Sequence, residues 1–223
     1  DSHNRHLFGG VVSGISGYGN CIGIPNVGGE ILFSPTYSGN PLVNAMCVGI
    51  VDKNRLTRAV TGEPGNLLML VGADTGRDGI LGASGLASRT FEEERDLRPT
   101  VQVGNPFLEK VLIEACLELV QTDYFVGIQD LGAAGLTSAS VEAADKSDCG
   151  VEIEISYVPR RDAGMDPYEV MLSESQERML IVVKDGCEKQ VRAIFDKWDV
   201  KSTVIGRVTD DGLVRILDKS VVV

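Results

Sequence analysis

From Asn66 onward, short apolar segments typical of strands alternate with segments that have the periodicity of helices. The predicted strands are residues 66–71, 124–129, 151–155, 179–183, 202–208 and 213–217, and the predicted helices are 107–120, 137–145 and 188–198. Such alternation builds a sheet covered by helices, so the fold class is α/β. The link Thr209-Asp-Asp-Gly212 predicts that the last two strands form a hairpin, which makes the sheet a mixed one.

The helix predicted over 107–120 has a clear start signal. Asn105 is a good N-cap, and Pro106 suits the first helical position, where its missing N–H costs nothing. The apolar stripe that is expected to face the core consists of Phe107, Val111, Ala115 and Leu119.

The first 57 residues have a different character. They are rich in glycine up to Gly29, and strand-like segments follow at 30–34 and 42–51. Two or three strands with so little helix beside them cannot form a core of their own. We therefore interpret 1–57 as part of a small β-rich domain, truncated at its start, and 58–223 as the α/β domain. Unpaired strand edges and apolar surface within 30–51 are expected to promote self-association.

Charge and hydropathy exclude two classes of function. The net charge of −11 argues against nonspecific nucleic-acid binding, which requires clustered lysine and arginine. No run of about 18 apolar residues occurs, so no membrane span is predicted. The five cysteines are scattered and never in C-x-x-C spacing, which indicates reduced thiols in a cytoplasmic protein and neither a disulfide framework nor a zinc site.

Histidine occurs only at His3 and His6. From residue 7 onward, no side chain titrates near neutral pH unless its environment shifts its pKa. A Ser-His-Asp or Cys-His arrangement is therefore impossible in the body of the chain, and nucleophilic hydrolysis is not expected there.

Four polar residues, Ser173-Glu-Ser-Gln176, stand directly before the apolar strand 179–183. Polar side chains at the mouth of a buried strand are costly to hide and well placed to hold a polar ligand. The alternative is an ordinary solvated turn. Gln102, in the loop before the helix 107–120, leaves the same two alternatives open.

Asp130 stands where the strand 124–129 meets the loop Gly132-Ala-Ala-Gly135, which opens a helix. Ligands favour the carboxyl ends of strands, and an aspartate there can hold Mg²⁺ against phosphate oxygens. The alternative is that Asp130 only caps a turn. The loop Gly72–Gly79 matches neither a Walker loop nor a dinucleotide fingerprint, so its glycines are interpreted as turn residues.

Several longer motifs are characteristic of one enzyme family. Among them are Tyr18-Gly-Asn-Cys-Ile-Gly23, Val101-Gln-Val-Gly-Asn-Pro106, Gly127-Ile-Gln-Asp130, Gly132-Ala-Ala-Gly-Leu-Thr-Ser138 and Leu172-Ser-Glu-Ser-Gln-Glu-Arg-Met179. In these motifs nearly the whole chain resembles phosphoribosylformylglycinamidine synthase, the large synthetase subunit in its small bacterial and archaeal form. The resemblance implies the mixed-sheet C-terminal domain of the aminoimidazole ribonucleotide synthetase-like superfamily, preceded by part of its ATP-binding type N-terminal domain.

In that family, ATP phosphorylates the formamide oxygen of formylglycinamide ribonucleotide, and ammonia from a separate glutaminase subunit then displaces phosphate. The resemblance implies that Gln102 contacts this nucleotide, that Glu174, Ser175 and Gln176 line its site, and that Asp130 binds Mg²⁺. It also implies ATP as a substrate, with the glutaminase and a small accessory subunit as partners. This chemistry is that of an ATP-dependent carbon–nitrogen ligase, in which Mg²⁺ offsets the charge of phosphoryl transfer.

The departures from the family concern the first residues. The family's catalytic histidines belong upstream of Arg5, and Ser2-His3-Asn4 imitates their motif in a place where it does not belong. We therefore assign no catalytic residue and expect an internal fragment of a longer enzyme, inactive by itself. The alternatives are a non-catalytic acidic binding or assembly domain, or another ATP-dependent member of the same superfamily.

Overall fold

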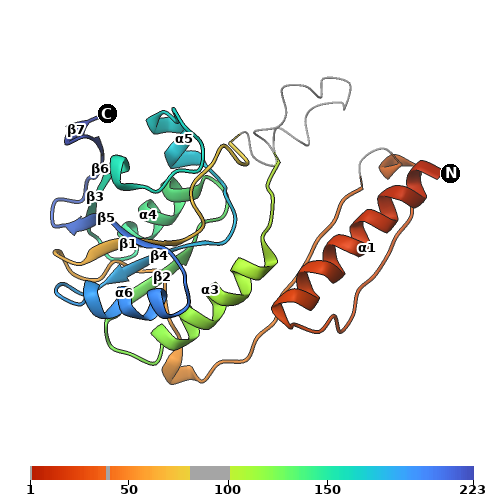
Figure 1. The fold of residues 1–223 in the computed structure, drawn as a ribbon, viewed down its shortest axis with the longest axis horizontal. Coiled ribbons are helices and arrows are strands. Elements are labelled where there is room, and N and C mark those ends of the chain that lie inside the picture. Colours follow the sequence, from red (N-terminus) through yellow and green to blue (C-terminus); the bar gives the residue numbers. More distant parts are fainter. Residues whose placement is uncertain (1, 39–40, 81–100) are drawn as a thin grey trace. The chain divides into compact units, whose positions relative to one another are not determined.

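A computed structural model describes residues 2–38, 41–80 and 101–223. The chain divides into two compact units, Asp1–Leu56 and Thr57–Val223 (Figure 1).

The second unit is built on one sheet. Its strands are β1 (Leu67–Gly72), β2 (Phe125–Asp130), β3 (Gly150–Glu154), β4 (Arg178–Val183), β5 (Ser202–Thr209), β6 (Val214–Asp218) and β7 (Val221–Val222). Its α-helices are α3 (Pro106–Leu119), α4 (Gly135–Asp145), α5 (Pro167–Leu172) and α6 (Glu188–Lys197). In the described residues the strand order is β2-β4-β1-β5-β3-β6-β7. The predicted α/β class with a mixed sheet is confirmed.

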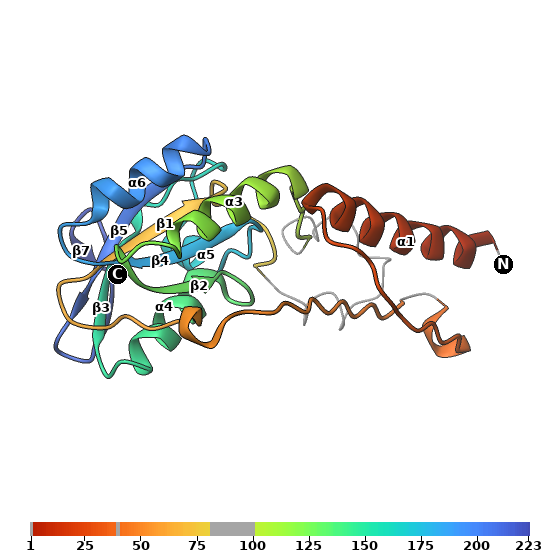
Figure 2. The same cartoon turned by 90° about the horizontal axis from the view of Figure 1, so that it is seen from below.

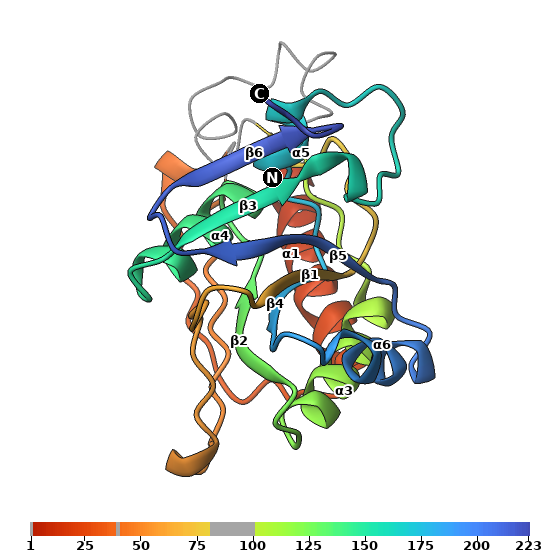
Figure 3. The ribbon, with the colours of Figure 1, turned by 90° about the vertical axis from the view of Figure 1, so that its left-hand side faces the viewer.

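Both faces of the sheet are buried. Successive residues of β1 point to opposite faces, so Leu68 and Leu70 join one core cluster while Met69 and Val71 join another. The first cluster includes Leu136 of α4 and Val170 of α5, and the second includes apolar residues of α3 and α6. Figures 2 and 3 show α3 and α6 on one face and α4 on the other. A strand covered on both faces reads as a continuous apolar run, as 67–71 does.

The predicted hairpin between the last two long strands is wrong. β3 lies between them, antiparallel to β5 and parallel to β6. Val151 and Ile153 of β3 are fully buried and need a place inside the sheet. The link from β5 to β6 crosses the start of β3 at Gly150, where Val151 N donates to Leu213 O at 2.9 Å. The sheet is therefore mixed because of the β3–β6 pair, and the turn signal at 209–212 marks a crossing.

α3 begins as predicted and presents a different face. Asn105 Oδ1 accepts from Leu108 N at 3.1 Å, which confirms the cap. Its buried residues are Leu112, Ala115 and Leu119, whereas Phe107 is 71% exposed. Residues spaced by four drift around a helix, so Phe107 and Leu119 lie about 120° apart. Phe107 was therefore wrongly assigned to the core stripe.

The outer edge of β2 is covered by the segment before β1. Ile128 N donates to Arg58 O at 3.1 Å. A Cβ at Gly127 would lie only 2.2 Å from Val60 O, so the two backbones meet where the side chain is missing. The residues around Val60 thus satisfy part of the edge that β2 would otherwise expose.

The first unit contains the helix α1 (Ser2–Ile22) and short 3₁₀ turns at Pro35–Tyr37 and Lys53–Arg55. The strands predicted at 30–34 and 42–51 are absent from the described part of this unit. A strand exists only with a partner that completes its hydrogen bonds, and no such pairing is seen among those residues. The helix was missed because a glycine-dense segment disfavours it.

Apolar side chains between the two 3₁₀ turns and before them are exposed; Phe33 and Met46 are 85% and 88% accessible. Self-association through 30–51 stays a prediction. Among the described residues, no helix is both long and apolar enough to cross a bilayer.

The crossing at Gly150 can be tested by Gly150→Ala. The added Cβ would lie 2.4 Å from Thr209 Oγ1 and 2.7 Å from Leu213 N, so the link must move. Overpacking of this kind should lower the free energy of unfolding by about 2 kcal/mol. Urea denaturation followed by circular dichroism measures the change, and an unaltered midpoint would contradict the arrangement.

Candidate functional site

Three segments that are distant in sequence meet at one edge of the sheet. β1 and β2 are both antiparallel to β4, and Gly72 and Asp130, their last residues, pair with Arg178 and Met179 at its start. The loops that follow β1 and β2 therefore lie beside the segment that precedes β4. This segment is the polar run 173–176.

The polar run is placed by α5, a helix that was not predicted from the sequence. Asp166 Oδ1 accepts from Glu169 N at 2.8 Å, and Glu169 Oε2 accepts from Asp166 N at 3.0 Å. Pro167 occupies the first turn, and Ser173 is the C-cap. The signal was present, because Asp-Pro-x-Glu has the spacing of a capping box with proline at its preferred position.

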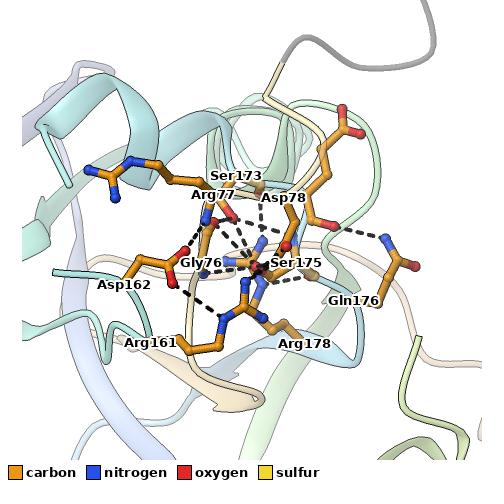
Figure 4. A network of polar contacts seen from close by, with 10 residues as sticks. Gly76, Arg77, Asp78, Arg161, Asp162, Ser173, Ser175, Gln176 and Arg178 are labelled. Carbon is orange, nitrogen blue, oxygen red and sulfur yellow. Dashed lines mark hydrogen bonds and ion pairs between the residues drawn. The ribbon is translucent and has the colours of Figure 1, made fainter. Parts of the chain in front are cut away.

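The serines of the run are buried in a polar network with the loop Gly72–Gly79 (Figure 4). Ser173 and Ser175 are 0% and 2% exposed. Ser173 Oγ donates to Gly76 O at 2.6 Å, and Ser175 Oγ accepts from Gly76 N at 2.9 Å. Ser175 Oγ also donates to the Asp78 carboxylate. The alternative of a solvated turn is therefore wrong for these serines, which fix the loop in place.

Arg178, the first residue of β4, anchors the polar run. Its guanidinium donates to Ser173 O at 2.6 Å, to Ser175 O at 2.8 Å and to Thr75 Oγ1 at 2.9 Å. It is 2% exposed, and burial lowers the pKa of Arg178 to about 10, partly opposed by the charge of Asp78. Sequence reasoning did not single out this residue, because an arginine at the start of a strand is normally read as a surface residue.

Asp78 is held by a second arginine. Arg161 Nη2 donates to both carboxylate oxygens of Asp78, at 2.9 and 3.0 Å, and this bond raises the pKa of Arg161. A Cβ at Gly76 would lie 2.0 Å from Arg161 Nη2, so the guanidinium occupies space that any side chain there would fill. Gly72 and Gly79 have φ values of +106° and +63°, which confirms them as turn glycines.

The structure brings Gln102, Glu174 and Gln176 together. Glu174 is 6% exposed, and its N–H donates to Asp78 O at 2.7 Å. Glu174 Oε1 accepts from Ala134 N at 3.1 Å, and its other oxygen accepts from the Gln102 side-chain amide. Gln176 Nε2 donates to Glu174 O at 2.8 Å. By contrast, the Ser175 hydroxyl is occupied within the network, so its predicted contact with a substrate stays a prediction.

Asp130 ends β2, and its side chain is exposed. The loop after it leads to Ala134, which precedes α4 and has a φ of +59°. The N–H of Ala134 donates to the Glu174 carboxylate. Within the residues that the structure describes, no group of three or more His, Cys, Asp or Glu side chains could hold a metal ion. A single exposed carboxylate at a strand end can supply one oxygen ligand to a hard cation such as Mg²⁺.

The polar groups of this arrangement are suited to binding a polar ligand. It offers one carboxylate held in place by a backbone N–H, two side-chain amides and one exposed aspartate at the same sheet edge. With histidine confined to His3 and His6, the second unit contains no imidazole base. The site can therefore orient a polar ligand and contribute to a metal site.

Comparison with known proteins shows two matching family models. The model "AIR synthase related protein, N-terminal domain" matches residues 1–51, and "AIR synthase related protein, C-terminal domain" matches residues 63–219. The chain is 56% identical over 217 residues to the phosphoribosylformylglycinamidine synthase subunit PurL of Caldanaerobacter subterraneus. That alignment covers 97% of the chain and 30% of the relative, so the chain spans about a third of the curated relatives that it matches.

Solved structures of PurL from T. maritima are also similar. The complex with FGAR superposes with a TM-score of 0.88 at 39% identity, covering 96% of this chain and 35% of that one. The complex with ATP gives 0.83 at 36% identity, with 96% and 33% covered. A structure of PurLQS from Thermotoga maritima gives 0.83 at 35% identity, with 96% and 34% covered.

The network predicts a response to acid at Arg77. Arg77 N donates to Asp162 Oδ2 at 2.7 Å, and this bond, aided by the charge of Arg161, lowers the pKa of Asp162. A lowered carboxyl pKa means that the bond persists until the pH falls through that value, below about 3.9, the ordinary value for aspartate. The Arg77 amide proton resonance, followed by NMR from neutral pH downward, should show this late transition.

Asp162→Asn serves as the control, since it keeps an oxygen acceptor and cannot titrate. The transition at the Arg77 amide should then shrink, and what remains reports Glu169, which accepts from Arg77 Nε at 2.7 Å and whose pKa this bond also lowers. A midpoint at or above the ordinary aspartate value in the unmodified chain would show that the bond does not stabilise the ionised carboxylate.

Proposed function

Because this chain belongs to the AIR synthase related proteins, we propose that it forms part of a phosphoribosylformylglycinamidine synthase and supplies the groups that recognise formylglycinamide ribonucleotide. The observation that carries the proposal is the buried Glu174 carboxylate, held by Ala134 N and the Gln102 amide beside Gln176. Fixed acceptors and donors of this kind orient a ligand rich in N–H and hydroxyl groups. The similarity to the T. maritima PurL complex with FGAR supports the same assignment.

The residues have separable roles in this proposal. Glu174 accepts hydrogen bonds from the substrate, and Gln102 and Gln176 each offer an amide that can donate and accept. Ser175 lines the site, and its hydroxyl fixes the loop by binding Gly76 N and the Asp78 carboxylate. Orientation of the formamide oxygen toward the phosphoryl donor is the contribution that such groups make to rate.

Asp130 would hold Mg²⁺, which supplies charge neutralisation during phosphoryl transfer from ATP. Its exposed carboxylate at the end of β2 fits this role. ATP as a substrate is supported by the similarity to the T. maritima PurL complex with ATP.

We further propose that residues 1–57 belong to the small N-terminal domain and 58–223 to the α/β domain of this enzyme. A glutaminase subunit and a small accessory subunit are proposed as partners in the cytoplasm. The family resemblance supports these partners, as does the similarity to PurLQS.

Binding of formylglycinamide ribonucleotide to the 223-residue chain tests the proposal directly by isothermal titration calorimetry. Gln176→Ala should weaken binding about tenfold, because one or two hydrogen bonds are lost, with a smaller effect on ATP. Gln190→Ala, an exposed glutamine on α6, should change neither. Absence of binding by the unmodified chain would overturn the assignment of substrate recognition to this segment.

The metal role is tested by Asp130→Asn in a complete enzyme that contains this segment. The change keeps the shape and removes the charge that the metal requires, so activity should fall about a hundredfold or more. Stability should change by about 1 kcal/mol or less, because the side chain is exposed. Asp123→Asn, also exposed but in the loop before β2, is the matched control. A sharp loss of melting temperature with intact specific activity would make Asp130 a structural turn residue.

A further inference from the structure

Gly79, at the end of the loop after β1, leaves a gap that the site residues fill. It has a φ of +63°. A Cβ built there would lie 2.6 Å from Glu174 Oε2, 2.7 Å from Glu174 Cβ and 3.0 Å from Gln102 Nε2. Real Cβ atoms do not approach other atoms so closely, since packed interiors leave no such overlap. The contact between Glu174 and Gln102 therefore exists only because residue 79 has no side chain.

The loop cannot move aside to relieve such an overlap. Asp78 is 8% exposed, and its carboxylate is held by Arg161 and Ser175. Gly76, three residues before Gly79, is tied to both buried serines through its N–H and its carbonyl. The backbone on which Gly79 sits is thus anchored to the same run that carries Glu174.

Glu174 is equally restrained. Its N–H is bound to Asp78 O, and its carboxylate is bound to Ala134 N at the start of α4. Because both its backbone and its carboxylate are held, a side chain at residue 79 would displace the carboxylate from Ala134, or the Gln102 amide from the carboxylate.

We propose that Gly79 is a positioning residue of the substrate site, and that the loop Gly76–Gly79 is the wall that sets the geometry of the Glu174–Gln102 pair. The expected effect of Gly79 on substrate binding rests on the proposed function. Its effect on the positions of Glu174 and Gln102 depends only on the geometry of the loop. This positioning gives a role to the glycine loop that matches no phosphate-binding motif.

The test compares Gly79→Ala with Gly186→Ala. Gly186 lies in the turn between β4 and α6, has a φ of +78° and has no atom within 4 Å of a built Cβ. Both variants force alanine into a left-handed conformation, and only the first meets the site. We expect backbone strain to lower the melting temperature of both variants by a similar amount. Any further decrease, caused by the overlap with Glu174, should occur only in Gly79→Ala.

Two readouts separate positioning from stability. Affinity for formylglycinamide ribonucleotide should fall at least about tenfold in Gly79→Ala and stay within about twofold in Gly186→Ala. The side-chain NH₂ resonances of Gln102, identified by their loss in Gln102→Ala, should move toward those of a glutamine amide without a hydrogen bond to a carboxylate, and they should do so in Gly79→Ala alone. Unchanged affinity together with unchanged Gln102 resonances would overturn the proposal.

The two proposals fail in different ways. If the unmodified chain does not bind the nucleotide, the proposed function fails, and the Gln102 resonances alone decide whether Gly79 positions the pair. If Gly79→Ala does not fold, Glu174→Gly removes the obstructing atoms, and the double variant is compared with Glu174→Gly alone. If Gly79 acts by positioning, adding Gly79→Ala to Glu174→Gly lowers the melting temperature no more than Gly186→Ala does in the unmodified chain. A double variant that remains unfolded overturns the proposal.

Discussion

The site depends on one buried cation. The Arg178 guanidinium binds two carbonyls of the polar run and the hydroxyl of Thr75, and so joins the segment before β4 to the loop after β1. A charge with so little access to water is stable only when its donors are occupied, and removal of one partner leaves the others unpaired. The side chains that we propose for substrate recognition therefore rest on a buried framework built around Arg178.

This division explains why a single run of sequence contains two kinds of residue. The hydroxyls of Ser173 and Ser175 bind the loop after β1, whereas the buried carboxylate of Glu174 binds the Gln102 amide and Ala134 N at the start of α4. Alternation of this kind follows from extended backbone leading into a strand, in which neighbouring side chains point in opposite directions. Because Ser173 and Ser175 are held by the loop, the positions that Glu174 and Gln176 can take are limited.

Much of the second unit was predictable, because its elements have local signals. The continuous apolar runs identified β1 and β4, and Asn105-Pro106 identified the start of α3. The order of strands was not predictable, since the turn signal at 209–212 is the same whether a link closes a hairpin or crosses another strand. In the first unit, the predicted strands failed because apolar sequence alone supplies no hydrogen-bonding partner.

The site was predictable to a similar degree. Polar residues at the mouth of a strand marked Glu174 and Gln176, and a strand end marked Asp130. The roles of Arg178, Asp78 and Arg161 could not be read from the chain, because each has at least one partner about 80 to 100 residues away, a distance at which spacing carries no information. The one local sign of such a network is a glycine where another residue comes too close for a side chain, as at Gly76 and Gly79.

The cover over β2 has a consequence for how this protein can be shortened. The residues around Val60 occupy the slot above Gly127 and bind the backbone of Ile128, so they belong to the sheet although they precede its first strand. A truncation that began at β1 would keep every named strand and helix of the second unit and still strip the outer edge of β2. Such a shortened protein would carry an open edge two residues from Asp130, and edge-to-edge pairing of chains would then compete with the metal binding that we propose for Asp130.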